Sequence, residues 1–309
     1  MPPGARRRRH VLALLAIVVT VVLWAASSIT AKALSTSGLV IVFWRLWFAI
    51  PLLWLTMLPR AMRRHLGREW LRGSVIGGVI FNVHQVLYFT SLKLTTVADV
   101  TIIGALQPVL VLLVAGPLFG ERASAGAIAW SAVAFAGTVI VMLGAVHAPT
   151  WSFAGDVLAL LNLFAFTAYF LASKRICETV GAWEYVVGMT TVSGVVMVPV
   201  ALATHQRLAQ PTAWEWAVLL AIAIFPGTLG HVFLNWAHAY VPAFVSSMVL
   251  LAVPIIATAG AAVLIDEPVS TMQIVGGTIV LGAIAIIVAS GRGRDAAVLV
   301  ESAALGEAP

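Results

Sequence analysis

Apolar positions in this chain form runs of about 20 residues that follow one another along nearly its whole length. A helix of that length crosses roughly 30 Å of hydrocarbon. The runs are continuous rather than alternating, which excludes a transmembrane β-barrel. The pattern therefore predicts an all-α membrane protein with ten transmembrane helices. The predicted spans are residues 11–33, 38–58, 71–92, 96–118, 125–144, 152–172, 183–204, 214–238, 242–264 and 271–290.

The first apolar run follows a basic leader, residues 1–10, in which four consecutive arginines begin at Arg6. Arginines, an apolar stretch and the small residues at 25–27 also fit a secretory signal peptide. We favour an uncleaved first span, because the run is long for a signal core. At the other end, residues 291–309 are small and mixed in character, and we expect a disordered cytoplasmic tail there.

Two stretches of the chain, residues 82–124 and 228–270, match each other without a gap at an offset of 146 positions. Each contains an apolar run with a proline in its middle, Pro108 or Pro254, and then a short polar turn. Self-similarity at a long period indicates an internal repeat. The chain is therefore expected to consist of two five-helix repeats between the leader and the tail. The predicted repeats are residues 11–145 and 151–290.

Basic residues gather on one side of the predicted membrane. With the N-terminus inside, 14 of the 18 Lys and Arg residues fall in or beside inner loops. The pI near 10.1 therefore reflects membrane orientation rather than nucleic-acid binding, and both termini are expected to be cytoplasmic. Five helices per repeat then insert the second repeat upside down relative to the first. Inverted repeats are a transporter plan in which the substrate site lies near the midplane of the membrane.

Polar residues inside the predicted spans concentrate on the third and the eighth helix. At the repeat offset, Asn82 and Gln85 align with Thr228 and His231, and their spacing marks one helical face. Such groups either bridge helices through hydrogen bonds or line a cavity, and we favour a cavity. The two polar stripes are Asn82, His84, Gln85 and Tyr88, and Thr228, His231, Asn235 and His238.

Prolines inside the spans predict departures from regular helix. Pro108 and Pro254 each remove a backbone hydrogen bond in mid-span, so each is expected to be a packed kink or a hinge. Pro226 and Gly227 interrupt span eight just before its polar stripe, which is typical of a discontinuous helix beside a site.

Charged residues in the spans leave alternatives open. Arg45 either snorkels to the outer surface, forms a structural pair or attracts an anionic substrate group, and we favour the first two. Asp99 is expected to form a capping box with Thr96 rather than a proton site. Glu121 and Glu267 are expected to cap spans five and ten.

Several segments carry a family resemblance: Trp24 in LWAASSITAKAL, Arg45 in FWRLWF, and a mid-span proline followed by a Gly-Glu or Asp-Glu turn in each half. Over about residues 11–290 the chain resembles the EamA-type branch of the drug/metabolite transporter superfamily. The resemblance implies a cavity formed by spans one, three, four, six, eight and nine. The small multidrug relatives carry a glutamate in their first span, and its absence here puts proton antiport by that route in doubt. The substrate-binding residues that the resemblance implies are Trp24, Ser28, Gln85, Tyr88, Gln107, Asn162, Tyr169, His231 and Asn235.

We expect an inner-membrane secondary transporter that exports small polar metabolites such as amino acids by alternating access. The alternatives are efflux of drugs or lipophilic cations and, from another class, a non-transporting membrane scaffold or receptor. No GxSxG, HExxH or Gly-rich phosphate loop is present, so no enzyme activity, cofactor or metal is expected. The expected partners are a small-molecule substrate and the lipid bilayer, without nucleic acid. A monomer and a homodimer both stay open, because Gly276, Gly277 and Gly282 predict a close helix contact within or between chains.

Overall fold

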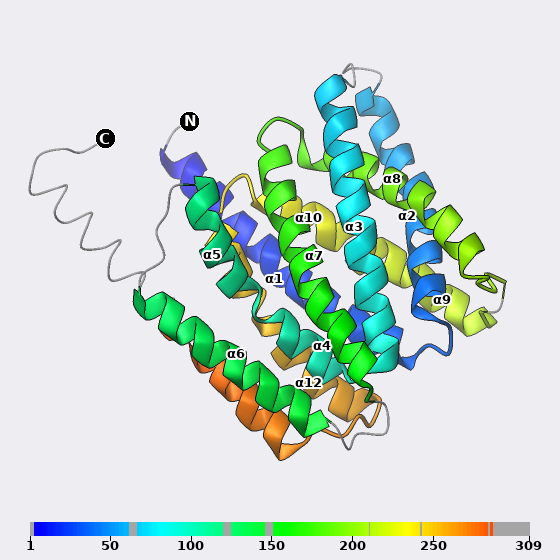
Figure 1. The fold of residues 1–309 in the computed structure, drawn as a ribbon. Coiled ribbons are helices and arrows are strands. Elements are labelled where there is room, and N and C mark those ends of the chain that lie inside the picture. Colours follow the sequence, from blue (N-terminus) through cyan, green and yellow to red (C-terminus); the bar gives the residue numbers. More distant parts are fainter. Residues whose placement is uncertain are drawn as a thin grey trace, which may run out of the picture.

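A computed structural model describes residues 3–61, 67–119, 125–145, 151–209, 211–241, 243–283 and 285–286 of the chain. Within these ranges all regular secondary structure is helical (Figure 1). The first half holds α1 (Pro3–Ala33), α2 (Gly38–Ala61), α3 (Arg68–Leu94), α4 (Val97–Gly104), α5 (Gln107–Phe119) and α6 (Ala125–Ala145). The second half holds α7 (Phe153–Ile176), α8 (Ala182–Ala203), α9 (Ala213–Ile222), the π-helical segment η1 (Ala223–Gly230), α10 (His231–Ala237), α11 (Ala243–Val249), α12 (Ala252–Leu264) and the helix Thr271–Ala283.

Among the described residues, eight helical segments are long and apolar enough to cross a membrane. Two more apolar helices, α12 and Thr271–Ala283, are shorter. The outward faces carry large apolar side chains such as Leu55 and Phe135, which are 70% and 58% exposed. Such a surface suits lipid, and helices are the structures that satisfy their own backbone hydrogen bonds there. The chain is a multi-pass helical membrane protein.

Two segments predicted as continuous spans are interrupted in the structure. α4 ends at Gly104 and α5 begins at Gln107, while α11 ends at Val249 and α12 begins at Ala252. The proline that follows each break cannot donate to the carbonyl four residues earlier, so the preceding turn tightens. The backbone N–H of Leu106 donates to the Ile103 carbonyl at 3.1 Å, and that of Val253 to the Leu250 carbonyl at 2.9 Å.

The interruption predicted at Pro226 takes another form. α9, η1 and α10 follow one another without a break, and the helix widens to π geometry through η1. Because Pro226 has no N–H to donate, one turn lacks its regular bond. The Thr228 hydroxyl instead donates to the Ala223 carbonyl, five residues earlier, at 2.9 Å. Span eight is therefore a continuous, locally widened helix rather than a discontinuous one.

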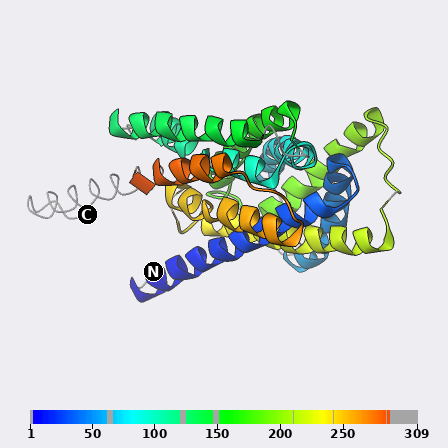
Figure 2. The ribbon, with the colours of Figure 1, turned by 90° about the horizontal axis from the view of Figure 1, so that it is seen from below.

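Small residues allow the helices at the centre of the bundle to pack closely. α3 packs along α7 and α8, and α1 packs along α10 and α12. A Cβ atom on Gly77 would lie 2.3 Å from the Tyr185 hydroxyl oxygen on α8, so only glycine fits there. The second view shows α1, in blue, running alongside α12 (Figure 2).

α6 lies beside the helix Thr271–Ala283 (Figure 1). A Cβ atom on Gly276 would lie 2.7 Å from the Gly137 carbonyl oxygen, so the contact requires a small residue. A Cβ atom on Gly277 would lie 3.2 Å from Ile102 of α4, whereas Gly282 has nothing within 4 Å. The close contact predicted for Gly276 and Gly277 is therefore made within the chain.

The acidic residues near the helix starts differ from expectation in their partners. Glu267 accepts from the backbone N–H of Val97 at 2.7 Å, so it caps α4 rather than span ten. The helix Thr271–Ala283 is capped instead by Ser270, whose hydroxyl accepts from the Gln273 backbone N–H at 3.1 Å. Glu121 lies outside the described residues.

The predicted capping box of Thr96 and Asp99 is half present. The Thr96 hydroxyl accepts from the Asp99 backbone N–H at 3.0 Å. The Asp99 carboxylate, however, accepts from Gln273 at 3.0 Å and lies 3.1 Å from the Thr95 hydroxyl. Asp99 therefore connects helices instead of capping its own helix.

Candidate functional site

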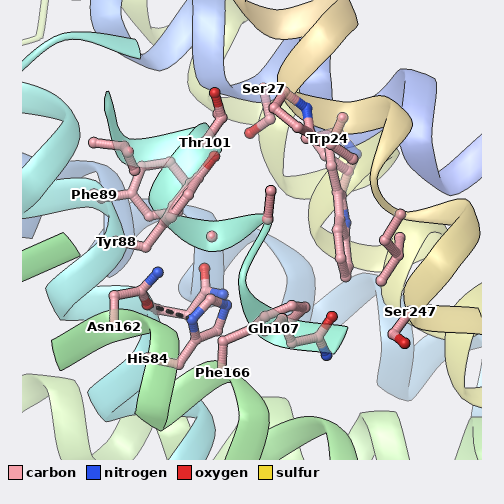
Figure 3. A pocket seen from close by; sticks show the side chains of 18 of the residues that line it. Trp24, Ser27, His84, Tyr88, Phe89, Thr101, Gln107, Asn162, Phe166 and Ser247 are labelled. Carbon is pink, nitrogen blue, oxygen red and sulfur yellow. Dashed lines mark hydrogen bonds between the residues drawn. The ribbon is translucent and has the colours of Figure 1, made fainter. Parts of the chain in front are cut away.

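A pocket lies in the centre of the bundle, between the two interrupted helices and the widened one (Figure 3). The volume open to the centre of a water molecule is about 100 Å³, room for several waters or part of a small metabolite. α1, α3, α4, α5, α7, η1, α10, α11 and α12 line it, and α2 adds Arg45. These are the spans that the family resemblance implied, with span two added.

Aromatic rings form most of the pocket wall. Trp24 of α1 stands on one side and Tyr88 and His84 of α3 on the other (Figure 3). Phe166 of α7 bridges these sides: its ring centroid lies 5.8 Å from that of Trp24 and 4.9 Å from that of His84. Such edge and tilted contacts fix the rings without filling the space between them.

Arg45 and His231 form a buried pair at the pocket. Arg45 Nη2 lies 2.9 Å from His231 Nε2, and the guanidinium sits over the Phe89 ring, 5.3 Å from its centroid. Because arginine only donates, His231 Nε2 must accept, and His231 is the neutral tautomer with its proton on Nδ1. The side chain of Arg45 is 4% exposed, so it does not snorkel to the outer surface; of the two favoured roles, the structural pair is present.

A second layer of hydrogen bonds holds this pair. His231 Nδ1 lies 3.1 Å from the Tyr169 hydroxyl oxygen and donates to it, given the tautomer. Asn235 donates to the same oxygen at 3.1 Å and to the His231 carbonyl at 2.8 Å. A hydrogen bond at one ring nitrogen of a histidine fixes which nitrogen carries the proton and how the ring is oriented.

A similar arrangement orients the α3 side chains. His84 Nδ1 lies 2.7 Å from Asn162 Oδ1 of α7 and donates to it (Figure 3). The Ser28 hydroxyl donates to the Trp24 carbonyl at 3.0 Å. The Tyr88 hydroxyl, 2.6 Å from Ser28 Oγ, must then be the donor to Ser28, which leaves the Tyr88 oxygen free to accept.

Two amide side chains in the pocket lining have polar atoms without a partner. Gln85 Oε1 and Gln107 Nε2 are buried and bond to nothing within the described residues. Both side chains are only 2% exposed. Buried polar groups are normally satisfied, so these atoms are available to water or a ligand. None of the described residues that line the pocket is Asp or Glu.

The structure brings six of the nine predicted site residues into the lining. They are Trp24, Gln85, Tyr88, Gln107, Asn162 and His231. Ser28, Tyr169 and Asn235 lie one layer behind and bond to a lining residue. Pro108 and Pro254, the predicted hinges, both line the pocket.

The other members of the polar stripes face away from the pocket. Asn82 donates to the Ser193 carbonyl of α8 at 3.0 Å, Thr228 bonds within its own helix, and His238 packs edge-on against Phe170. These three residues make contacts within or between helices. For them, the alternative to a cavity lining is the one that the structure shows. Lining residues that the sequence missed include Ser27, Phe89, Thr101, Phe166 and Ser247. Ser27 adjoins Ser28, and Phe166 lies one turn from Asn162, so helical spacing alone could have indicated these two.

A helical bundle that crosses the membrane many times and encloses a central pocket is an architecture that membrane transporters share. The family comparison gives the same class: the model of the EamA-like transporter family matches residues 11–143 and again residues 153–289. The chain belongs to the EamA-like transporter family.

Two relatives are named as amino-acid exporters. The aromatic amino acid exporter YddG of Ancylobacter novellus is 32% identical over 177 residues, a match that spans 54% of this chain and 56% of that exporter. The probable terminal-alkyne amino-acid exporter of Streptantibioticus cattleyicolor is 25% identical over 278 residues, covering 88% of this chain and 92% of that protein. A solved crystal structure has a similar fold, with a TM-score of 0.64 at 21% identity over 91% of this chain and 97% of that one.

Proposed function

We propose that this protein exports amino acids, with aromatic amino acids as the first candidates. The observation that carries the proposal is the central pocket, which combines aromatic walls with unpartnered buried amide atoms. Aromatic walls suit an apolar side chain, and a few polar groups fix the orientation of a small ligand. The names of the two relatives support the same substrate class. The nine residues predicted from the sequence are the proposed substrate-binding residues and their supports.

The proposed mechanism is alternating access by two inverted five-helix repeats, residues 11–145 and 151–290, with ten spans and both termini cytoplasmic. Two separate matches to one family model support the repeat. So do the interruptions before Pro108 and Pro254, which fall at equivalent positions of the two halves. Rocking of the halves about these interrupted helices would open the pocket to either side, which makes the two prolines candidate hinges.

Efflux of lipophilic cations is the second candidate, and the pocket disfavours it. A cation in a low-dielectric site needs an acidic partner, and none of the described lining residues supplies one. Arg45 adds a positive charge to the lining and would repel a cation. A drug without charge stays compatible with the aromatic walls.

Amino-acid efflux from dipeptide-loaded bacterial cells, with the protein expressed or absent, tests the proposal. We expect faster release of phenylalanine, tyrosine or tryptophan when the protein is present in the membrane. No acceleration for any amino acid, with membrane expression confirmed, would exclude the proposed substrate class.

The double variant Gln85→Ala/His231→Ala separates a transporter from a scaffold in the same assay. A transporter should lose flux at unchanged membrane expression, because both side chains line the pocket. The matched control is Asn82→Ala/His238→Ala, which likewise removes one amide and one imidazole from the same two spans, at positions outside the pocket lining. Equal flux in the two double variants would mean that the pocket does not carry the substrate.

A further inference from the structure

Arg45 carries a buried charge that has no counter-ion among the described residues. Its guanidinium contacts His231 and the Phe89 ring, and neither carries a negative charge. Within the described part of the chain no carboxylate pairs with it, and no Asp or Glu lines the pocket that it faces. A charge inside a membrane bundle is costly and normally has a partner or a function.

We propose that Arg45 binds the carboxylate of the transported amino acid, an inference that rests on the transport function proposed above. A guanidinium has five N–H donors in a planar fork that matches a carboxylate. The bond to His231 occupies Nη2, and among the described residues the other two guanidinium nitrogens have no hydrogen-bond partner. The guanidinium can therefore bind a carboxylate in the pocket without giving up His231.

The surroundings hold the guanidinium in place for this task. His231, kept as the neutral tautomer by its bonds to Arg45 and Tyr169, is an acceptor that positions Nη2. Gly227 leaves space on the other side, since a Cβ atom there would lie 3.0 Å from Arg45 Nε. His231 is thus a positioning residue for Arg45 as well as part of the pocket lining.

The rest of the pocket complements the other two parts of an α-amino acid. Gln85 Oε1 is an acceptor without a partner among the described residues. An ammonium group only donates, so it needs such an acceptor. The rings of Trp24, Tyr88 and Phe166 supply a wall for an apolar or aromatic side chain. The inferred ligand is a zwitterion whose carboxylate faces α2 and whose ammonium faces α3.

Carboxylate recognition can be tested on the wild-type protein with a series of ligands. Purified protein in liposomes would exchange radiolabelled L-phenylalanine against L-phenylalanine, L-phenylalaninamide, 3-phenylpropionate and phenethylamine as competitors. We expect the amide and the amine, which lack the carboxylate, to compete at least about tenfold more weakly than phenylalanine, since charge-assisted bonds are the strong ones. 3-Phenylpropionate should compete better than phenethylamine.

Variants then assign the preference to Arg45. In Arg45→Gln, phenylalanine should compete at least about tenfold more weakly than in the wild type, and no better than its amide. Arg45→Lys should keep part of the preference for phenylalanine over the amide, because lysine supplies a single point charge. The matched control is Arg72→Gln, an exposed arginine of α3 outside the pocket lining, which should leave the series unchanged.

The outcomes distinguish this inference from the transport proposal. If phenylalanine exchanges but the amide competes equally on the wild type, or if Arg45→Gln keeps the discrimination, Arg45 is only a structural pair and the inference is overturned. If another amino acid is the one exported, that amino acid and its amide replace the phenylalanine pair. If no amino acid exchanges, the transport proposal itself fails. Should Arg45→Gln not fold, Arg45→Lys decides: an undiminished preference for phenylalanine over its amide in that variant would overturn the inference.

Discussion

The third span and its counterpart at the repeat offset differ in backbone geometry, although both reach the pocket. α3 is one uninterrupted α-helix, whereas α9, η1 and α10 form a helix that widens to π geometry in the middle. Gln85 and His231 align at the offset of 146, and both line the pocket. The two copies therefore deliver a polar group to the same cavity from different backbones.

The widened segment η1 lies against two residues of the pocket lining, Trp24 and Arg45. The Pro226 carbonyl accepts from Trp24 Nε1 at 3.3 Å. Gly227 leaves room for Arg45, and a Cβ atom on Gly230 would lie 2.7 Å from Trp24 Nε1. At the offset, Gly230 corresponds to His84, which itself lines the pocket. α3 presents side chains, and the widened helix also presents its backbone, so residues that align at the offset of 146 do not have the same role.

The largest expected effect is at His231. His231→Ala removes the acceptor of Arg45 and the link to Tyr169, so amino-acid efflux should fall by more than about tenfold at equal membrane expression. His238→Ala, two turns further along the same span, should change efflux by less than about twofold, a matter of tenths of a kcal/mol. A similar loss in both variants would mean that the widened helix as a whole is needed rather than the side chain that it places in the pocket.

A substitution of Gln85 gives the corresponding test for α3, the helix with regular geometry. Gln85→Ala removes an unpartnered acceptor from the lining, and we expect efflux to fall by about five- to tenfold, which corresponds to the net contribution of one typical hydrogen bond. Asn82→Ala, one turn earlier on α3, loses only the two bonds to Ser193 of α8 and should stay within about twofold. Transport that depends on Asn82 and not on Gln85 would contradict the assignment of faces on α3.

Gly230→Ala tests the close approach that the widened turn allows. The added methyl group must displace the Trp24 indole, and we expect efflux to fall by roughly three- to fivefold. Gly282→Ala is the control, because nothing lies within 4 Å of a Cβ atom there. In that helix alanine should leave transport unchanged and stabilise the protein by up to about 1 kcal/mol in a denaturation series. Full transport by Gly230→Ala would show that the indole position is not critical.

Trp24→Phe is expected to have the smallest effect. It keeps an aromatic wall but loses the bond from Nε1 to the Pro226 carbonyl. That bond is long, and its loss should reduce efflux by about twofold or less. A loss as large as that of His231→Ala would indicate that the indole N–H itself binds the substrate.

Helix positions could be predicted from the sequence because apolar run length fixes what can span a bilayer. The local geometry at the prolines could not. Pro108, Pro226 and Pro254 all remove a backbone bond, yet two interrupt their helix and one widens it. Which of these follows depends on the neighbours that take up the freed groups, such as the Thr228 hydroxyl.

The polar stripes were also only partly predictable. A helical wheel gives the direction of a side chain but not its height along the helix axis. His238 lies seven residues after His231 on the same side of the helix, and at that height it packs against Phe170 beyond the pocket lining. Arg45 and His231 are 186 positions apart, so no local pattern could indicate their pairing.

Thiol labelling can report directly on the pocket, because the chain has a single cysteine, Cys177. Burial raises the pKa of the Cys177 thiol to about 12, so at pH 8 it stays protonated and should react slowly with alkylating reagents. Cys177→Ser therefore gives a background in which one introduced cysteine can be followed. Ser27, labelled in Figure 3, lines the pocket, and Ser37 is exposed on the loop after α1.

The most direct test of the pocket as the substrate site is protection of the Ser27→Cys variant, in the Cys177→Ser background, from a small membrane-permeant thiol reagent. With an exported amino acid at ten times its Kd, alkylation at position 27 should slow by about tenfold, while the Ser37→Cys variant should react at an unchanged rate. Alkylation of the Ser27→Cys variant at the same rate with and without an amino acid that saturates exchange would contradict the assignment of this pocket as the transport site.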